Sequence, residues 1–407
     1  MEQTPNRLWN KGFILIFIAN VFMHMGQQTI TALIPKYAYA MGAASTVVGI
    51  ASGAFAISAL VSKPFTSPAF ICVQRRKIFL VACFIFLIAY ILFFFAPNVN
   101  WLIAGRLLQG IGTGIAAPVS LSIACDNMPE GSFSKGVSMF SLGQAFGQAI
   151  GPSVGLSLSR SLGYKTTFVI CFTLMAICTA LSFKISCKPP QEGAKYRIRF
   201  DTIIDKRAVP TAFTMTFITI AYSCIPGFLA IYGDLLGIMN IGLYFTIYAI
   251  AILVLRFVTG GLADRFGYRR VLLTSLFCFA ITFVLFSFSR SLPLFIVAAL
   301  FSALGYGVTL PNMQALCMSS VPSDRRGVAS NTLYLFQDIG QSVGPWLAGM
   351  LIDALIISRS PAGLDAADND AKVYAYSTMY LVIIIAVVIA MILVFLMTRK
   401  KTSTEQE

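Results

Sequence analysis

The chain contains twelve long apolar stretches, and each is long enough to cross a lipid bilayer. A hydrocarbon core of ~30 Å is crossed by a helix of about 20 residues. Only 11% of the residues are charged, against ~25% in soluble domains, so too little polar surface exists to cover a water-soluble protein of 407 residues. The sequence therefore predicts an all-α integral membrane protein. Its spans are expected near residues 12–34, 45–68, 78–96, 101–124, 136–158, 165–186, 211–234, 241–262, 271–289, 293–318, 327–353 and 374–397.

The formal net charge of +14 is spread over the short loops between these stretches. Loops rich in Lys and Arg stay on the cytoplasmic side of a membrane. This rule places both termini in the cytoplasm and the acidic segment 365–370 outside. We therefore expect a multi-pass protein of the cell (plasma) membrane. Because the basic residues do not gather on one domain, no nucleic-acid partner is predicted.

Two halves of the sequence repeat each other. Residues 112–118 (GTGIAAP) recur as 305–311 (GYGVTLP), and 305 − 112 = 193. Residues 147–152 (GQAIGP) recur as 340–345 (GQSVGP) at the same offset of 193. Internal repeats of six spans are typical of secondary transporters. The predicted organisation is an N-terminal six-helix bundle at 1–187, a basic cytoplasmic linker at 188–210 and a C-terminal six-helix bundle at 211–407.

A short charged loop, GGLADRFGYRR at residues 260–270, joins two of the apolar stretches. Glycines there let the backbone turn and neighbouring helices approach closely. The stretch resembles the G-x-L-A-D-R-x-G-x-R-[RK] loop signature of the major facilitator superfamily. That resemblance implies two pseudo-symmetric six-helix bundles around a central cavity, and a gating role for this loop. The gating residues it implies are Gly260, Asp264, Arg265, Gly267, Arg269 and Arg270.

The first half keeps only the basic end of this loop. At the offset of 193, Ile71 stands in the place of Asp264, and Gln74 in the place of Gly267. Ile71 supplies no carboxylate, so we expect gating by this loop from the second copy alone.

Arg106 is predicted to lie several residues inside the fourth span. A charge at that depth is costly and should face the bundle interior, on one helical face with Gln109, Thr113 and Ser120. The run Arg106-x-x-Gln109-Gly110 resembles the span-4 motif that the family associates with proton coupling. The alternative is a snorkelling arginine near the outer interface.

The fifth span carries a small residue at every fourth position, followed by a proline. Such a stripe packs closely against another helix, and the proline is expected to bend its own helix. The pattern resembles the motif that marks drug/proton antiporters within the superfamily, which implies export by exchange. Its residues are Gly143, Gly147, Gly151, Pro152 and Gly155.

Asp338 is the one carboxylate that the spans place deep in the membrane, in the eleventh span. A carboxylate removed from water takes up a proton more readily, so Asp338 is our first candidate for proton coupling. A structural carboxylate paired with Arg256 or with hydroxyl groups is the alternative. His24, the only histidine, lies in the first span, where related antiporters often carry an acid and this chain has none. It is a further candidate for proton coupling, or else a hydrogen-bonding partner of a neighbouring helix.

Polar residues on the faces of several spans are candidates for a substrate cavity. The resemblance implies a cavity lined chiefly by spans 1, 4, 7 and 10, with additions from spans 5 and 11. Pro226-Gly227 gives the seventh span a possible break or bending point. The candidate cavity residues are Gln27, Gln28, Thr31, Gln109, Thr113, Thr219, Tyr222, Asn312, Asn331 and Tyr334.

These features predict a secondary transporter and no enzyme. No P-loop, metal-site spacing or C-x-x-C occurs, so neither ATP, a metal nor another cofactor is expected. The predicted function is proton-driven efflux of a small amphipathic organic compound or drug by alternating access, from a monomer in the bilayer. One alternative is a proton-coupled symporter importing a small organic anion, with Arg106 and Arg256 as carboxylate clamps. Another is a membrane receptor or scaffold that does not transport.

Overall fold

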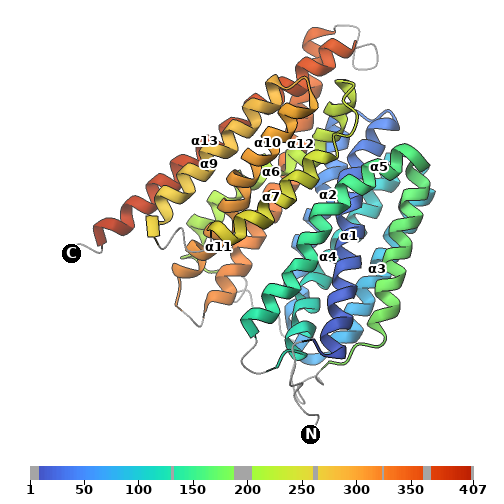
Figure 1. Cartoon of the computed structure of the whole chain (residues 1–407), viewed down its shortest axis with the longest axis vertical. Coiled ribbons are helices and arrows are strands. Elements are labelled where there is room, and N and C mark those ends of the chain that lie inside the picture. Colours follow the sequence, from blue (N-terminus) through green and yellow to red (C-terminus); the bar gives the residue numbers. More distant parts are fainter. Residues whose placement is uncertain are drawn as a thin grey trace. The chain divides into compact units, whose positions relative to one another are not determined.

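The computed structural model describes residues 9–129, 133–187, 204–259, 265–322, 325–360 and 368–404, and these residues form helices with no strand among them. Ten stretches within this part of the chain are long and apolar enough to cross a membrane, and Leu243–Leu255 is a shorter apolar helix. The helices, labelled in Figure 1, are α1 (Lys11–Ala40), α2 (Ser45–Cys72), α3 (Arg75–Phe95), α4 (Val99–Asp126), α5 (Phe133–Ser182), α6 (Val209–Leu235), α7 (Leu243–Thr259), α9 (Tyr268–Phe288), α10 (Leu292–Ser302), the π-helix η2 (Ala303–Gly307), α11 (Val308–Ser319), α12 (Arg326–Arg359) and α13 (Asn369–Thr404).

Helix α5 accounts for two of the predicted spans. Its 50 residues are interrupted at Gly163, whose φ of 82° and ψ of 166° belong to a region that favours glycine. The break replaces the longer connection expected between residues 158 and 165. With the two arms of α5 counted separately, and Leu292–Ser319 counted as one stretch, the described residues hold twelve helical segments, in agreement with the twelve predicted spans.

The repeat seen in the sequence is also present in the helix boundaries. Helix α3 begins at Arg75 and α9 at Tyr268, and 268 − 75 = 193. Both ends of α4 are displaced by 193 onto the ends of the continuous stretch Leu292–Ser319. The starts of α5 and α12 differ by the same number. One offset therefore relates three helices of the first half to three of the second.

The chain forms two compact units. Unit 1 comprises Met1–Tyr37 and Ala54–Ile198, and unit 2 comprises Ala38–Gly53 and Arg199–Glu407. Helix α2 thus belongs to unit 2 in its first nine residues and to unit 1 beyond Gly53. Within unit 2, α13 and α9 run side by side (Figure 1).

Helix α3 is apolar on both its buried and its exposed face. Its buried residues, among them Phe79, Phe86 and Phe93, recur three or four positions apart and face the interior of unit 1. The opposite face exposes Phe84 and Ile88, which are also apolar. A helix of this kind needs lipid on its exposed side, which agrees with a membrane-spanning role.

Two predicted proline sites lie inside continuous helices. Helix α6 is continuous from Val209 to Leu235, so Pro226 does not break it. Pro152 likewise lies inside α5, where the single non-helical residue is Gly163. The one irregularity in the region of the tenth span is η2, which the sequence did not predict. Single π-helical turns often occur at functional sites.

The orientation of the chain is testable by labelling. In a cysteine-free background, a cysteine at Asn369, the exposed first residue of α13, should react with an impermeant maleimide only from outside the cell. A cysteine at Gly193, which lies outside the described residues, should react only from the cytoplasm. The reverse pattern would show that the positive-inside assignment of this chain is wrong.

Candidate functional site

The polar residues predicted on the first and fourth spans meet inside unit 1. The amide of Gln27 on α1 donates to Thr113 Oγ1 on α4 at 3.0 Å. Arg106 donates to Gln109 Oε1 at 2.8 Å, and Thr113 Oγ1 donates to the Gln109 carbonyl at 2.9 Å. The structure thus joins four of the predicted site residues in one network. Thr31 donates to the Gln27 carbonyl in its own helix at 2.9 Å.

Arg106 is fully buried, at 0% exposure. Its guanidinium lies 4.3 Å from the centre of the Phe55 ring, a cation–π contact that adds to the hydrogen bond with Gln109. A snorkelling arginine would reach the polar interface, so that interpretation is wrong. An intramembrane arginine held inside a bundle is a functional candidate.

The described interior of unit 1 is cationic. It contains Arg106 and also Lys36 of α1, which is 8% exposed. The one carboxylate among the described residues of unit 1 is Asp126, at the end of α4, and it pairs with Arg75 at 2.5 Å. This ion pair was missed in the sequence, because the two residues are 51 positions apart and belong to different helices. The described interior of unit 1 thus contains two buried basic side chains, on α1 and α4.

The glycine stripe of α5 packs against α1. A Cβ added at Gly143 would meet Asn20, one at Gly147 would meet the His24 backbone, and one at Gly151 or Gly155 would meet Thr29. Thr29 Oγ1 also donates to the Gly151 carbonyl at 3.0 Å. Packing is thus the physical role of these residues, including the contact that holds the His24 segment of α1. The second copy of the stripe, Gly340 and Gly344 on α12, meets α6 in the same way.

Enlarging this contact should destabilise the protein. A Cβ at Gly147 would lie 2.7 Å from the His24 carbonyl carbon, which cannot move without shifting α1. Overpacking of this kind costs ~1–3 kcal/mol, so Gly147→Ala is expected to lower the melting temperature of the purified protein. Gly327→Ala is the control, because nothing lies within 4 Å of the added carbon. Equal melting temperatures would contradict the packing role.

Asp338 lies in the middle of α12 and is 8% exposed. It is within electrostatic range of Tyr334, one turn earlier on the same helix. The Tyr334 hydroxyl in turn accepts from Gln314 Nε2 of α11 at 3.3 Å. These contacts place Asp338 and Tyr334 together, as the sequence predicted. Nothing is described of the Arg256 side chain, so the pairing of Asp338 with Arg256 stays a hypothesis.

Several predicted cavity residues bond within their own helices. Thr219 Oγ1 donates to the Met215 carbonyl at 3.0 Å, and Asn312 Nδ2 donates to the Val308 carbonyl at 2.7 Å. Asn331 lies at the start of the same helix as Asp338 and is partly exposed, and so is Gln28 on α1. The hydrogen bonds of Thr219 and Asn312 thus stay within their own helices.

Tyr222 of α6 stacks on a residue that the sequence did not single out. Its ring lies 3.8 Å from that of Tyr306 with the planes 6° apart, and Tyr248 of α7 lies 6.4 Å from it. Tyr306 belongs to the π-helical turn η2 and occupies the repeat position of Thr113. The sequence repeat, which aligns Tyr306 with Thr113, was the signal that could have identified it. The polar network of unit 1 contains amides and a guanidinium, whereas the corresponding cluster of unit 2 consists of aromatic rings.

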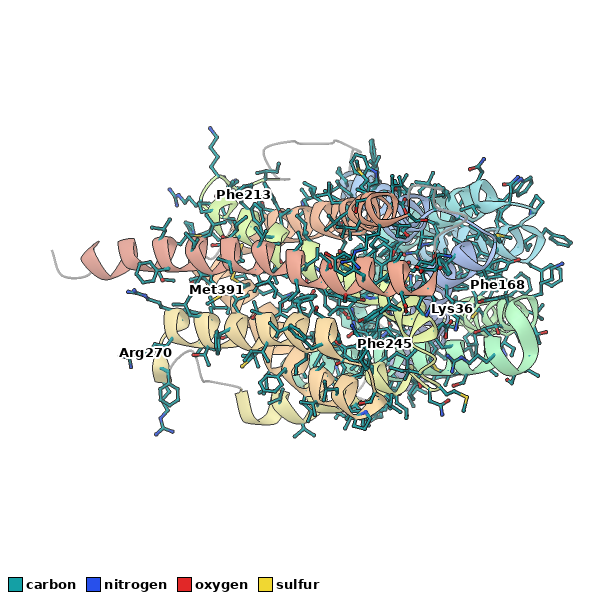
Figure 2. The ribbon with its side chains drawn as sticks, turned by 90° about the horizontal axis from the view of Figure 1, so that it is seen from above. Lys36, Phe168, Phe213, Phe245, Arg270 and Met391 are labelled. Carbon is teal, nitrogen blue, oxygen red and sulfur yellow. The ribbon has the colours of Figure 1, made fainter. Side chains whose placement is uncertain are left out.

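The gating loop is described only in its second part. Gly260 and Asp264 lie outside the described residues. Gly267 has a φ of 80° at the start of α9, where glycine is favoured, and Arg269 lies 4.1 Å from the centre of the Phe395 ring of α13. Arg265 lies 5.2 Å from the centre of the Phe266 ring, and Arg270 lies in the first turn of α9 (Figure 2).

The first turn of α2 is fastened to α12 within unit 2. Asp353 accepts from the backbone N–H of Ser45 at 2.9 Å, from that of Thr46 at 2.8 Å and from Thr46 Oγ1 at 2.6 Å. A carboxylate at a helix N-terminus satisfies its free N–H groups and opposes its dipole. Asp353 is not among the residues predicted from the sequence, and this contact was missed.

Glycines let the same two helices approach closely along their length. A Cβ at Gly49 or Gly53 would collide with the α12 backbone at Pro345 or Ser342, and one at Gly349 would collide with Ser45. The contact therefore combines backbone packing with the cap made by Asp353. Spacing of glycines four apart in α2 was a usable signal for it.

The sequence matches the Major Facilitator Superfamily over residues 16–238 and 211–407. It is 22% identical over 356 residues to the staphylopine export protein of Staphylococcus aureus (strain Mu50), covering 84% of this chain and 89% of that protein. It is 34% identical over 163 residues to the multidrug resistance protein MdtG of Rahnella sp. (strain Y9602), covering 38% and 39% respectively.

Solved structures share the same fold. A bacterial homolog of the human lysosomal transporter Spinster has a TM-score of 0.80 at 15% identity, over 97% of this chain and 98% of that one. The nucleoside transporter NupG has a TM-score of 0.74 at 12% identity, over 96% and 99%. Fold and sequence together define a multi-pass membrane transporter. The chain belongs to the Major Facilitator Superfamily.

Proposed function

We propose that the protein is a proton-coupled exporter of a small amphipathic organic compound. In this proposal it works as a monomer in the cell membrane, with both termini in the cytoplasm. The observation that carries the coupling is the position of Asp338, buried in the middle of α12 beside Tyr334. A desolvated carboxylate there can exchange a proton during each cycle.

Export is supported by two independent features. The glycine stripe of α5 resembles the antiporter motif and packs on α1 as that motif requires. A relative that matches most of the chain is named for export, and one that matches part of it is named for multidrug resistance. Within unit 1, Arg106 and the Gln27–Gln109–Thr113 network would bind a polar group of the substrate.

Alternating access in this chain would involve α2. Its first nine residues belong to unit 2 and the remainder to unit 1. Any movement of one unit against the other must therefore release Ser45 and Thr46 from Asp353 or bend α2 near Gly53. We propose release at Asp353, because hydrogen bonds to a carboxylate can form and break without distorting a helix. The second copy of the gating loop would act at the other end of the transporter, with Asp264 as its carboxylate.

A second candidate function is uptake of an organic anion by proton symport. The cationic interior of unit 1, in which Arg106 and Lys36 are buried, favours an anionic substrate. This observation bears on the charge of the substrate more than on the direction of transport.

Direction is tested in inverted membrane vesicles. Compounds that accumulate in a deletion strain supply the substrates to try. An exporter should concentrate the compound inside inverted vesicles when protons are pumped inward, and Asp338→Asn vesicles should not. Loss of the compound from energised vesicles would favour symport, and no movement of any bound compound would favour a receptor or scaffold.

A further inference from the structure

A cavity of about 350 Å³ lies at one end of unit 2, apart from the residues assigned to transport. Its walls are Pro210 and Thr211 at the start of α6, Leu316 and Ser320 at the end of α11, and residues 396–398 of α13. The hydroxyls of Ser320 and Thr398 bond to carbonyls of their own helices, so the lining is chiefly hydrocarbon. Thr214 Oγ1 of α6 contacts the Sδ of the lining residue Met397 at 3.6 Å.

The end of unit 2 that contains this cavity is strongly basic. Lys206 and Arg207 are exposed just before Pro210, and Arg269 lies over the ring of Phe395, next to the cavity residue Leu396. In Figure 2, Arg270 lies at the same end of unit 2, beyond Met391 of α13.

In the described part of unit 2, the acidic residues other than Asp205 lie away from the basic end. At the basic end the described carboxylate is Asp205, and it is neutralised by Arg325 at 2.6 Å. Asp234, Asp353, Asp368 and Asp370 belong to the opposite ends of α6, α12 and α13. An apolar cavity with a cationic rim is complementary to an anionic amphiphile.

The occupant must come from the membrane or from the chain itself. The linker at 188–203 carries four basic residues and two acidic ones, Glu192 and Asp201, so its net charge is 4 − 2 = +2 and repels the same rim. The cavity lies where the membrane-spanning stretch of α6 begins and where that of α13 ends. Phospholipid is the amphiphile present at that depth, with apolar chains inside and the phosphate at the interface.

We propose that this cavity binds one acyl chain of an anionic phospholipid, with the lipid phosphate held by Lys206, Arg207 and Arg269. In the proposed orientation this lipid belongs to the cytoplasmic leaflet. The site is separate from the proposed substrate and proton sites, because none of its residues belongs to the Arg106 network or the Asp338 face, whereas Arg269 is also one of the gating-loop residues. It ties α6, α11 and α13 of unit 2 together.

Binding is tested on the full chain purified in a neutral detergent, without transport substrate. Native mass spectrometry and melting temperature are recorded with dioleoyl phosphatidylglycerol, with dioleoyl phosphatidylcholine and with inorganic phosphate. The two lipids share their chains and differ in headgroup charge, whereas phosphate supplies the anion without a chain. We expect phosphatidylglycerol alone to stay bound and to raise the melting temperature.

Variants locate the bound lipid. Lys206→Gln combined with Arg207→Gln should reduce bound phosphatidylglycerol several-fold, and Leu396→Trp should do so by filling the cavity. Lys372→Gln, a basic residue at the opposite end of α13, is the matched control and should bind like the unmodified protein. Equal retention of both lipids, equal stabilisation by phosphate, or undiminished binding in the rim and cavity variants would overturn the proposal.

Discussion

Replacing Asp338 by asparagine is expected to reduce substrate accumulation driven by a pH gradient to the level of empty liposomes, while exchange of substrate for substrate continues. Asparagine has nearly the shape of the protonated carboxylic acid but cannot release a proton. The residue is 8% exposed and lies beside Tyr334, and its own turn of α12 offers no second carboxylate to replace it. Both activities are measured in proteoliposomes containing the purified variant.

A purely structural role for Asp338 predicts a different outcome. If the carboxylate served only to neutralise a buried cation, its loss would leave that cation unpaired and lower folding yield. Expression and melting temperature are therefore recorded beside transport. Asp370→Asn, at an exposed carboxylate in the first turn of α13, controls for a general loss of negative charge. A well-folded Asp338→Asn protein that still responds to a pH gradient would rule out the coupling role, and His24 would be the next residue to test.

Replacing Asp353 by asparagine is expected to release the first turn of α2 from α12. The asparagine has one acceptor oxygen and directs its NH₂ group toward donors that now bond to the carboxylate. Hydrogen bonds to a charged group are each worth about 1.5–3 kcal/mol. Loss of about 3 kcal/mol changes the equilibrium between bound and released states by roughly two orders of magnitude.

Release is measured through a cysteine at Ser45 in a cysteine-free background. Ser45 is 3% exposed and uses its backbone N–H for the bond to Asp353, so the substitution preserves that bond. A membrane-impermeant maleimide should label the cysteine slowly in the parent and at least about tenfold faster with Asp353→Asn. A tenfold change corresponds to about 1.4 kcal/mol, which is less than the loss of about 3 kcal/mol expected from the hydrogen bonds. An unchanged labelling rate, with the melting temperature retained, would show that Asp353 does not hold α2 closed.

Much of the fold was predictable because a membrane leaves few choices. Apolar stretches of this length must form helices, and the offset of 193 predicted which helices correspond. Helix α3 and helix α9 agree with that offset at both ends. Glycine spacing predicted the close packing of α5, although not that its partner would be α1. The possible break at Pro226 is absent because α6 is continuous there, and the bends expected at Pro152 and Pro226 stay predictions.

The site was predicted less completely, for reasons of distance along the chain. Arg106, Gln109 and Thr113 share a helical face, so their proximity followed from spacing alone. The contacts of Asp353 with Ser45 and of Arg75 with Asp126 join residues from different helices, and no spacing rule connects them. Tyr306, which stacks on Tyr222, belongs to the π-helical turn η2, and no residue pattern predicted that turn.

The central claim, that protons and substrate move in opposite directions, is tested most directly by following protons themselves. Proteoliposomes containing the unmodified protein and a pH-sensitive dye inside are loaded with the substrate and diluted into substrate-free medium without a pre-formed pH gradient. Outward movement of substrate should drive protons inward and acidify the interior, and Asp338→Asn liposomes should show no change. Alkalinisation of the interior would demonstrate symport, and substrate efflux with no pH change would demonstrate uncoupled transport. Either result would contradict proton-coupled export.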